Sequence, residues 1–172
     1  MTRIGAAAMS RLASVVVVAA VLGVSAFVGR RNAPDQSHPG TRRWYQRLDK
    51  PSYTPPDGAF GAVWPVLETG LAVGAYRLLR QPRSSSRSVA LGLWLLNTGM
   101  IGGWTQLFFR DRKLGPSAIA SGAMIVSSAS YVAAAAKVDR TAAVVGLPLV
   151  GWLTFATLLA ERIWEKNRNR AV

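Results

Sequence analysis

The sequence predicts an all-α integral membrane protein whose single domain, residues 1–172, is a bundle of five transmembrane helices. Half of the 172 residues are hydrophobic, and they concentrate in five long stretches, at 12–29, 58–79, 89–109, 115–136 and 141–163. Because an α-helix rises about 1.5 Å per residue, roughly 20 apolar residues cross a hydrocarbon core about 30 Å thick. Most connections between these stretches are too short to hold a separate soluble domain.

A soluble helical bundle is the alternative interpretation. It would require polar stripes at a period of 3.6 residues, but segment 89–109 offers only Asn97, Thr98, Thr105 and Gln106 as polar residues. The net charge of +13 could suggest a nucleic-acid partner. The cations are dispersed between the apolar stretches, however, which argues against nucleic acid and favours the lipid bilayer as partner. The absence of cysteine excludes disulfides and thiolate metal sites.

The first stretch, 12–29, has two interpretations. Arg3 and Arg11 ahead of an apolar run are typical of a signal peptide. The run is long for a signal peptide, however, and Arg30 and Arg31 follow it directly. We therefore expect a retained transmembrane helix.

The connection 30–57 combines aromatic residues, prolines and cations, and the run across its end reads WYQRLDKPSYTPPDGAFGAVW. Proline fixes its own φ and favours extended backbone in the residue before it, so this run cannot be one regular helix or strand. We expect a stiff loop that acts as a lid over a binding cavity. Such a lid would lose little conformational entropy when a ligand binds.

Single residues mark features of the later helices. Asp57 is the expected N-cap of helix 58–79, and Pro65 can kink the first turns of that helix. Pro148 lies inside the stretch 141–163, where the missing N–H predicts a bend.

The distribution of cations predicts the orientation in the membrane. Most of the 21 Lys and Arg residues lie on the side that carries the connection 30–57 and the C-terminus. Cytoplasmic loops of membrane proteins carry an excess of Lys and Arg. We therefore expect the proline-rich loop and the C-terminus to face the cytosol, although the sequence does not identify the membrane.

Residues suited to catalysis are scarce. The one histidine, His38, lies in the connection 30–57, and there is no pair of carboxylates at catalytic spacing. A His-ligated haem or metal inside the membrane is therefore excluded, and Met100, Met124 and Tyr131 are better explained by packing. We predict no catalytic residue, no metal site and no required cofactor.

Aromatic side chains are abundant instead. An aromatic belt at the membrane surface explains Trp164 and the pair Phe108–Phe109, which lie at helix ends. Trp152 lies near the middle of its stretch, where a belt residue is not expected. Its indole, like that of Trp64, could either line a cavity for a flat ligand or pack against other helices.

Polar and small residues inside the stretches have two interpretations each. Glu68 and Asn97 could face a cavity or could be hydrogen-bonded to neighbouring helices for structure alone. The glycine pair 70 and 74 could serve close helix packing within one chain or a dimer, and we expect packing within one chain. The second pair, Gly99 and Gly103, could serve such packing or the interface of a homodimer.

The strongest run, WYQRLDKPSYTPPDGAFGAVWPVL, resembles the signature of the TspO/MBR family, the tryptophan-rich sensory proteins and translocator proteins. Trp104 with Phe108-Phe109, and Pro148-x3-Trp152-x2-Phe155, match further family motifs in the same order. The resemblance implies a five-helix membrane bundle whose first loop covers a pocket for porphyrins and, in some members, sterols. It also implies a homodimer formed through small residues of the third helix, where Gly99 and Gly103 stand.

The resemblance and the aromatic pattern together predict the ligand-binding residues. They are Trp44, Tyr45, Lys50, Pro51, Tyr53, Phe60, Trp64, Glu68, Asn97, Trp104, Phe108, Trp152 and Phe155. Arg43, Arg47 or Lys50 could meet the carboxylates of the ligand at the membrane rim.

The chain departs from the family pattern at several positions. Glu68 stands where the family usually has Tyr, and Ile101 replaces an Asn of the third helix. Glu161 and Glu165 occupy places where the sterol motif of animal members needs a Tyr and a basic residue, which makes a sterol the less favoured ligand.

The predicted function is binding of a tetrapyrrole similar to protoporphyrin IX, with a role in tetrapyrrole sensing, transport or turnover. One alternative is a proton-linked transporter of a small solute that uses Glu68, although no inverted repeat is evident. Another alternative is light- or oxygen-dependent degradation of the porphyrin, for which the chain has aromatic residues but no acid–base set.

Overall fold

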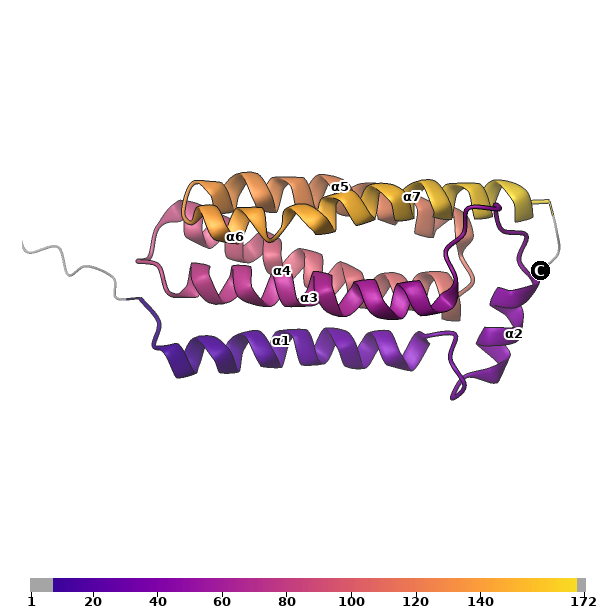
Figure 1. The fold of residues 1–172 in the computed structure, drawn as a ribbon, viewed down its shortest axis with the longest axis horizontal. Coiled ribbons are helices and arrows are strands. Elements are labelled where there is room, and N and C mark those ends of the chain that lie inside the picture. The colour runs from indigo at the N-terminus through magenta and orange to yellow at the C-terminus, as the bar shows by residue number, and fades with distance from the viewer. Residues whose placement is uncertain (1–7, 170–172) are drawn as a thin grey trace, which may run out of the picture.

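The computed structural model of the protein describes residues 8–169, and every regular element in that range is helical. Long helices of 21 to 23 residues run along the long axis of the molecule (Figure 1). They are α1 (Arg11–Asn32), α3 (Asp57–Leu79), α4 (Ser85–Thr105), α5 (Leu114–Ala136) and α7 (Leu147–Asn167). Two short helices, α2 (Pro39–Arg47) and α6 (Arg140–Val144), and the π-helical turn η1 (Gln106–Arg110) complete the described chain.

Four segments of the described chain are long and apolar enough to cross a membrane. They are α1, α3, α5 and the stretch Arg140–Asn167, which contains both α6 and α7. Helix α4 is not among them. The predicted all-α bundle is therefore confirmed, whereas the predicted number of five transmembrane helices is not.

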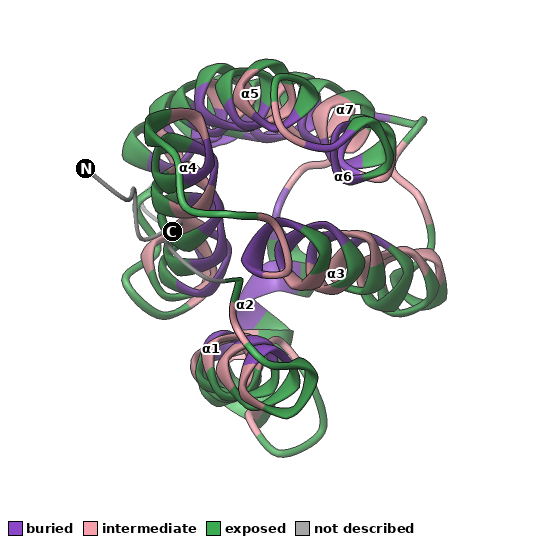
Figure 2. Cartoon of the chain, turned by 90° about the vertical axis from the view of Figure 1, so that its left-hand side faces the viewer, coloured by how far each residue is buried: buried purple, intermediate pink, exposed green. Residues whose placement is uncertain are grey.

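The long helices form one bundle with α1 on its outside. Viewed along the bundle, α4, α5 and α7 curve around one side of α3, and α1 packs against α4 and α3 (Figure 2). Many large apolar side chains point outward, which suits contact with acyl chains. On α1 these exposed side chains include Leu12, Val15, Val16, Val24 and Phe27.

Side-chain oxygens cap the N-termini of several helices. The Ser10 hydroxyl accepts from the Ala13 amide at the start of α1, and the Ser84 hydroxyl accepts from the Arg87 amide at the start of α4. Asp57 is not the N-cap predicted for α3, because it lies inside the first turn and Pro56 occupies the cap position without a side-chain bond. Asp57 still places a negative charge near the positive end of the helix dipole.

Two predictions about the helices were wrong. The connection 30–57 is not all loop, since it contains helix α2 with Pro39 in its first turn. The stretch 141–163 is not one bent helix, because α6 ends at Val144 and α7 begins at Leu147 with Pro148 in its first turn. Proline fits the first turn of a helix, where its missing N–H has no intrahelical partner anyway. Pro148 therefore starts a helix here and does not bend one.

Close packing between helices occurs where glycine was predicted to allow it. A Cβ atom added to Gly70 would lie 2.5 Å from the Val145 carbonyl oxygen, between α6 and α7. A Cβ atom on Gly74 would collide with the Tyr131 hydroxyl of α5. Packing through Gly70 and Gly74 within one chain is therefore confirmed, and it holds α3 against α5 and the α6–α7 junction.

Helix α1 also makes specific contacts with the bundle. The Ser25 hydroxyl donates to the Thr98 carbonyl of α4 at 2.8 Å, and Gly102 lies directly opposite Ser25. Ser14 and Val18 are buried on the same helix. These contacts fit a helix that belongs to the bundle, while its retention in the mature protein stays a prediction.

Candidate ligand-binding site

Phe60, Trp64, Trp152 and Phe155 form an aromatic group between α3 and α7, which we call the α3–α7 group. Residues 60 and 64 lie one turn apart on α3, and residues 152 and 155 lie on one face of α7. The Trp152 ring centroid is 5.7 Å from Phe60, 6.5 Å from Trp64 and 5.5 Å from Phe155. All four side chains are half-buried. Trp152 is therefore the centre of this group.

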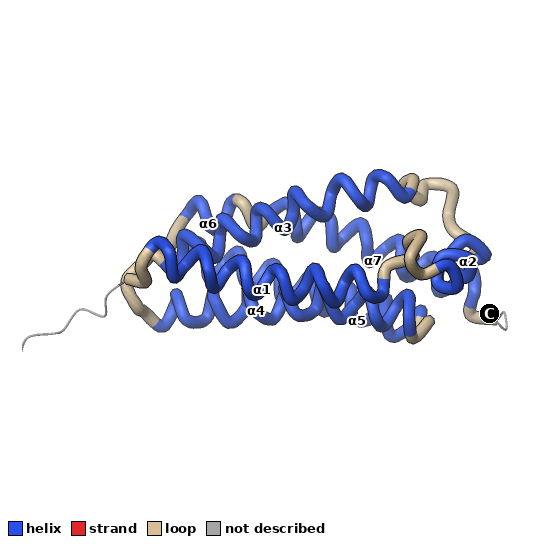
Figure 3. Tube along the Cα trace, turned by 90° about the horizontal axis from the view of Figure 1, so that it is seen from below, coloured by secondary structure: helices blue, strands red, loops and turns tan. Residues whose placement is uncertain are grey.

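A second aromatic group lies at the end of the bundle where α2 crosses it (Figure 3). We call it the α2–η1 group, and it contains Trp44 and Tyr45 of α2, Trp104 of α4, and Phe108 and Phe109 of η1. The Trp104 and Phe108 rings are stacked, with centroids 4.8 Å apart and 17° between their planes. Tyr45 meets Phe109 edge-on at 5.4 Å.

Phe108 does not belong to an aromatic belt at the membrane surface, which corrects one of the predictions. Its side chain is 2% exposed, and Trp44, Tyr45, Trp104 and Phe109 surround it. In a regular α-helix residues i and i+4 already share a face, and the wider π-turn at 106–110 adjusts the last turn of this helix. The stacking of Phe108 on Trp104 is the result.

The two groups are joined through a shared apolar cluster. Phe60 and Phe155 of the α3–α7 group pack against the same buried residues as Phe108, among them Leu159 and Ile163 of α7. Trp104 contacts this cluster and also the main core of the bundle, and its indole N–H donates to the Ser117 carbonyl at 2.9 Å. The described structure therefore brings most of the predicted aromatic residues to one end of the bundle.

The loop 48–56 connects α2 to α3 beside these groups. Pro51 is buried, and both the amide and the hydroxyl of Thr54 donate to the Pro51 carbonyl, at 3.0 and 2.7 Å. These bonds close a turn that the prolines stiffen. Tyr53, by contrast, is 51% exposed and makes no ring contact with the other aromatic residues of the described chain.

Lys50 and Tyr45 form a cation–π pair in which the Lys50 ammonium lies 4.5 Å from the ring centroid. Burial raises the pKa of the Tyr45 phenol to about 12, and the nearby Asp57 carboxylate acts in the same direction. Burial also lowers the pKa of the Lys50 ammonium, against the opposing effects of Asp57 and Asp49. The Tyr45 phenol is therefore neutral at pH 7, a state in which it can donate a hydrogen bond.

Sequence reasoning missed Arg112. Its guanidinium lies 5.5 Å from the Trp44 ring centroid, and its backbone has a φ of 56°. A positive φ is uncommon for a residue with a side chain, and here it directs the connection between η1 and α5. Nothing in the sequence pairs Arg112 with an aromatic residue so distant along the chain. Arg43 and Arg47, which were predicted to meet ligand carboxylates, are exposed on α2.

The two predicted polar residues, Glu68 and Asn97, lie on different helices, α3 and α4. Glu68 is half-buried on α3, one turn after Trp64. Asn97 is fully buried on α4, where its Nδ2 donates to the Leu93 carbonyl at 2.8 Å. The Asn97 Oδ1 atom has no hydrogen-bond partner within the described chain.

Gly99 and Gly103 lie on an open face of α4. Both are exposed, and a Cβ atom added to either would meet nothing within 4 Å. They therefore do not serve helix packing within the described chain, and their place in a homodimer interface stays a prediction.

Comparisons with known proteins agree on one family. The family model described as "TspO/MBR family" matches residues 14–165. Translocator protein from Homo sapiens is 30% identical over 145 residues, which cover 82% of each chain. Translocator protein from Ovis aries is 30% identical over 133 residues, 74% of this chain and 77% of its own. Tryptophan-rich sensory protein from Cereibacter sphaeroides is 26% identical over 151 residues, 88% of this chain and 89% of its own.

Proposed function

The chain belongs to the TspO/MBR family, and from this premise we propose that it is a membrane protein that binds a flat tetrapyrrole between α3 and α7, beneath the loop 48–56. The observation that carries the proposal is the half-buried state of Phe60, Trp64, Trp152 and Phe155. Fully packed rings would offer no face to a ligand, whereas these four rings keep part of their surface accessible.

The chemistry of the site suits a porphyrin. Its macrocycle is a broad aromatic plane that can stack on indole and phenyl faces, which attract it by dispersion and by burial of apolar surface. Its carboxylates would extend toward the membrane rim, where Lys50 of the loop, Arg43 and Arg47 of α2, and Arg112 are available. Guanidinium groups bind carboxylates through paired hydrogen bonds.

We also propose that α4 spans the membrane as a fifth helix. It has 21 residues and lies between α1 and α5, which are both candidate spans. Asn97 and Thr98 reduce its hydropathy, yet both are buried, and each donates to a carbonyl one turn back on the same helix. Their polarity is therefore turned away from lipid. By the distribution of cations, the loop 48–56 and the C-terminus would face the cytosol.

Titration of protoporphyrin IX into the purified protein tests the proposed ligand. We expect saturable quenching of tryptophan fluorescence, because the indoles of the α3–α7 group would contact the macrocycle. An unrelated membrane protein with the same number of tryptophans serves as the control for non-specific partitioning. Quenching that is linear in porphyrin, or equal to that of the control protein, would contradict the proposal.

A further inference from the structure

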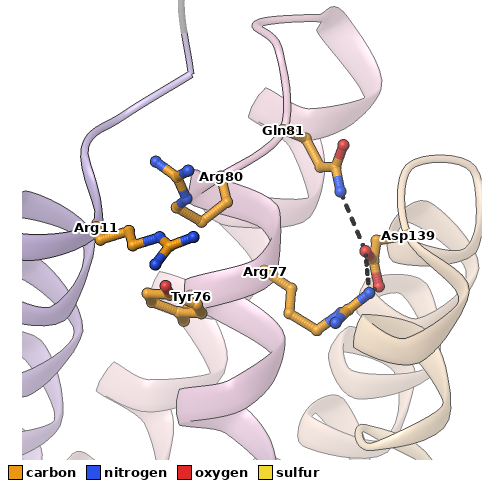
Figure 4. A pocket seen from close by; sticks show the side chains of 6 residues that line it. All are labelled: Arg11, Tyr76, Arg77, Arg80, Gln81 and Asp139. Carbon is orange, nitrogen blue, oxygen red and sulfur yellow. Dashed lines mark hydrogen bonds and ion pairs between the residues drawn. The ribbon is translucent and has the colours of Figure 1, made fainter.

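A pocket lies at the opposite end of the bundle from α2 and the loop 48–56. Its cavity volume is about 250 Å³, and its lining comes from the start of α1, the end of α3 and the connection between α5 and α6 (Figure 4). The lining residues are Arg11, Tyr76, Arg77, Arg80, Gln81 and Asp139. Three guanidinium groups thus face one cavity with a single carboxylate in its lining.

One side of this pocket is fully paired. Asp139 is 8% exposed and accepts four hydrogen bonds, two from Arg77 at 2.8 and 2.9 Å, one from Gln81 at 3.1 Å and one from the Ala142 amide at 2.8 Å. Two carboxylate oxygens offer about four acceptor positions in total. Asp139 therefore has no capacity left for a further cation.

The other side of the pocket is not paired. Figure 4 shows the Arg11 guanidinium beside Tyr76 and the Arg80 guanidinium above it, both away from Asp139. The Arg80 side chain donates only to the Met9 carbonyl, which leaves its charge uncompensated. The Arg11 side chain makes no hydrogen bond or ion pair with residues 8–169. Arg11 also stands in the first turn of α1, where no acidic residue offsets the positive end of the helix dipole.

Two guanidinium groups beside one cavity repel each other unless an anion lies between them. We propose that this pocket binds a phosphate group, held by Arg11 and Arg80 and by a hydrogen bond from the Tyr76 hydroxyl. Guanidinium forks match the oxygens of a phosphate, and such charge-assisted bonds are among the strongest in proteins. The paired Arg77–Asp139–Gln81 side forms a fixed wall.

The source of the phosphate is either an anionic phospholipid headgroup or a soluble phosphate compound. The pocket opens at helix ends, and in a bilayer the phosphate groups of lipids lie at that depth. Basic pockets between transmembrane helices bind anionic headgroups in this way. The site is separate from both aromatic groups and does not depend on the tetrapyrrole proposal.

Native mass spectrometry of the full-length protein with added phosphatidylglycerol, and in parallel with phosphatidylcholine, tests the proposal. We expect one phosphatidylglycerol to be retained by the wild type, and roughly tenfold less retention by the double variant R11Q/R80Q. The matched control is R83Q/R140Q, which removes two exposed arginines at the same end of the bundle that do not line the pocket. Equal retention by the two double variants would overturn the proposal.

Single variants distinguish the loss of the binding site from a general loss of structure. Arg11→Gln breaks no hydrogen bond within residues 8–169, and Tyr76→Phe changes no charge, so both should lower retention while the melting temperature without lipid is unchanged. A parallel arm replaces lipid with inorganic phosphate and measures thermal stabilisation. Stabilisation that requires Arg11 and Arg80 assigns the phosphate to a soluble source, whereas lipid retention alone assigns it to the membrane. No Arg11-dependent effect in either arm would refute the site.

Discussion

Asn167 and Asp49 are 118 positions apart in the chain and are joined by two hydrogen bonds. The Asn167 Oδ1 atom accepts from the Asp49 amide at 3.0 Å, and its Nδ2 atom donates to the Asp49 carbonyl at 2.9 Å. Asn167 is 3% exposed and also donates to the Ile163 carbonyl on its own helix. The end of α7 therefore holds the start of the loop 48–56 in place.

Asn167→Ala should release this loop. A buried amide that pairs with backbone groups contributes about 1–3 kcal/mol when its loss leaves those groups unsatisfied. We expect a lower melting temperature and faster hydrogen exchange in residues 48–54, measured by mass spectrometry. Lys166→Ala removes an exposed neighbour and serves as control. Unchanged exchange in the loop of Asn167→Ala would show that other contacts hold it.

Gly74→Ala should destabilise the bundle. The added methyl group would collide with the Tyr131 hydroxyl, and overpacking of a close helix contact costs about 1–3 kcal/mol. Gly151→Ala is the matched control, because its methyl group would enter open space on α7. Alanine is a better helix former than glycine by about 1 kcal/mol, so the control should be neutral or more stable. Thermal unfolding in detergent measures both, and equal melting temperatures would contradict the packing argument.

Trp152→Ala should weaken porphyrin binding more than Trp164→Ala. Trp152 is the centre of the α3–α7 group, whereas Trp164 is 38% exposed and lies against Gly115. Loss of one stacking indole is expected to raise the dissociation constant roughly tenfold. Fluorescence titration with protoporphyrin IX measures the difference. If both variants bind alike, the α3–α7 group is not the site.

Asp139 should make the stability of the fold depend on pH. Its bonds to Arg77, with further bonds to the Ala142 amide and Gln81, hold the pKa of this carboxyl below its ordinary value of 3.8. A group whose pKa is lowered in the folded state stabilises that state above the unfolded pKa and loses this contribution as pH falls through the folded pKa. We expect Asp139→Asn to be less stable than the wild type at pH 7, and the difference to narrow below about pH 4. A constant difference between pH 7 and pH 3 would contradict this account.

Gly99→Leu and Gly103→Leu should disrupt a homodimer without unfolding the chain. Both glycines lie on an open face of α4, where an added Cβ atom would meet nothing within 4 Å. If this face is a dimer interface, it depends on close backbone approach, which leucine prevents. Sedimentation or light scattering of the detergent-solubilised protein reports the change in mass. A monomeric wild type would contradict the homodimer, and variants that stay dimeric would place the interface elsewhere.

Hydropathy predicted the long helices well because the requirement to cross a membrane leaves a strong signal in composition. Helix α2 was missed because it has only nine residues and is polar overall, with three arginines, although Pro39 marks its first turn. The break at residues 145–146 was predicted as a bend, since sequence alone does not say whether a proline bends one helix or starts another.

The sequence predicted which residue types form the site but not which of these residues contact one another. The aromatic spacing indicated that Trp64 and Trp152 were unusual, yet it could not show that both meet in one group with Phe60 and Phe155. Phe108 was first read as a surface residue because it lies at a helix end. Its burial depends on α2, which covers that end and which the sequence did not reveal.

Helix α3 is held most closely by its neighbours at Gly70 and Gly74. Phe60 lies ten residues before Gly70, which is about 15 Å along the axis of an α-helix. A small tilt of α3 about these glycines would move Phe60 and Trp64 away from Trp152. Residues close to the glycines would move less. The space between α3 and α7 could therefore widen for a ligand while the close contacts of α3 with α5 and α6 stay in place.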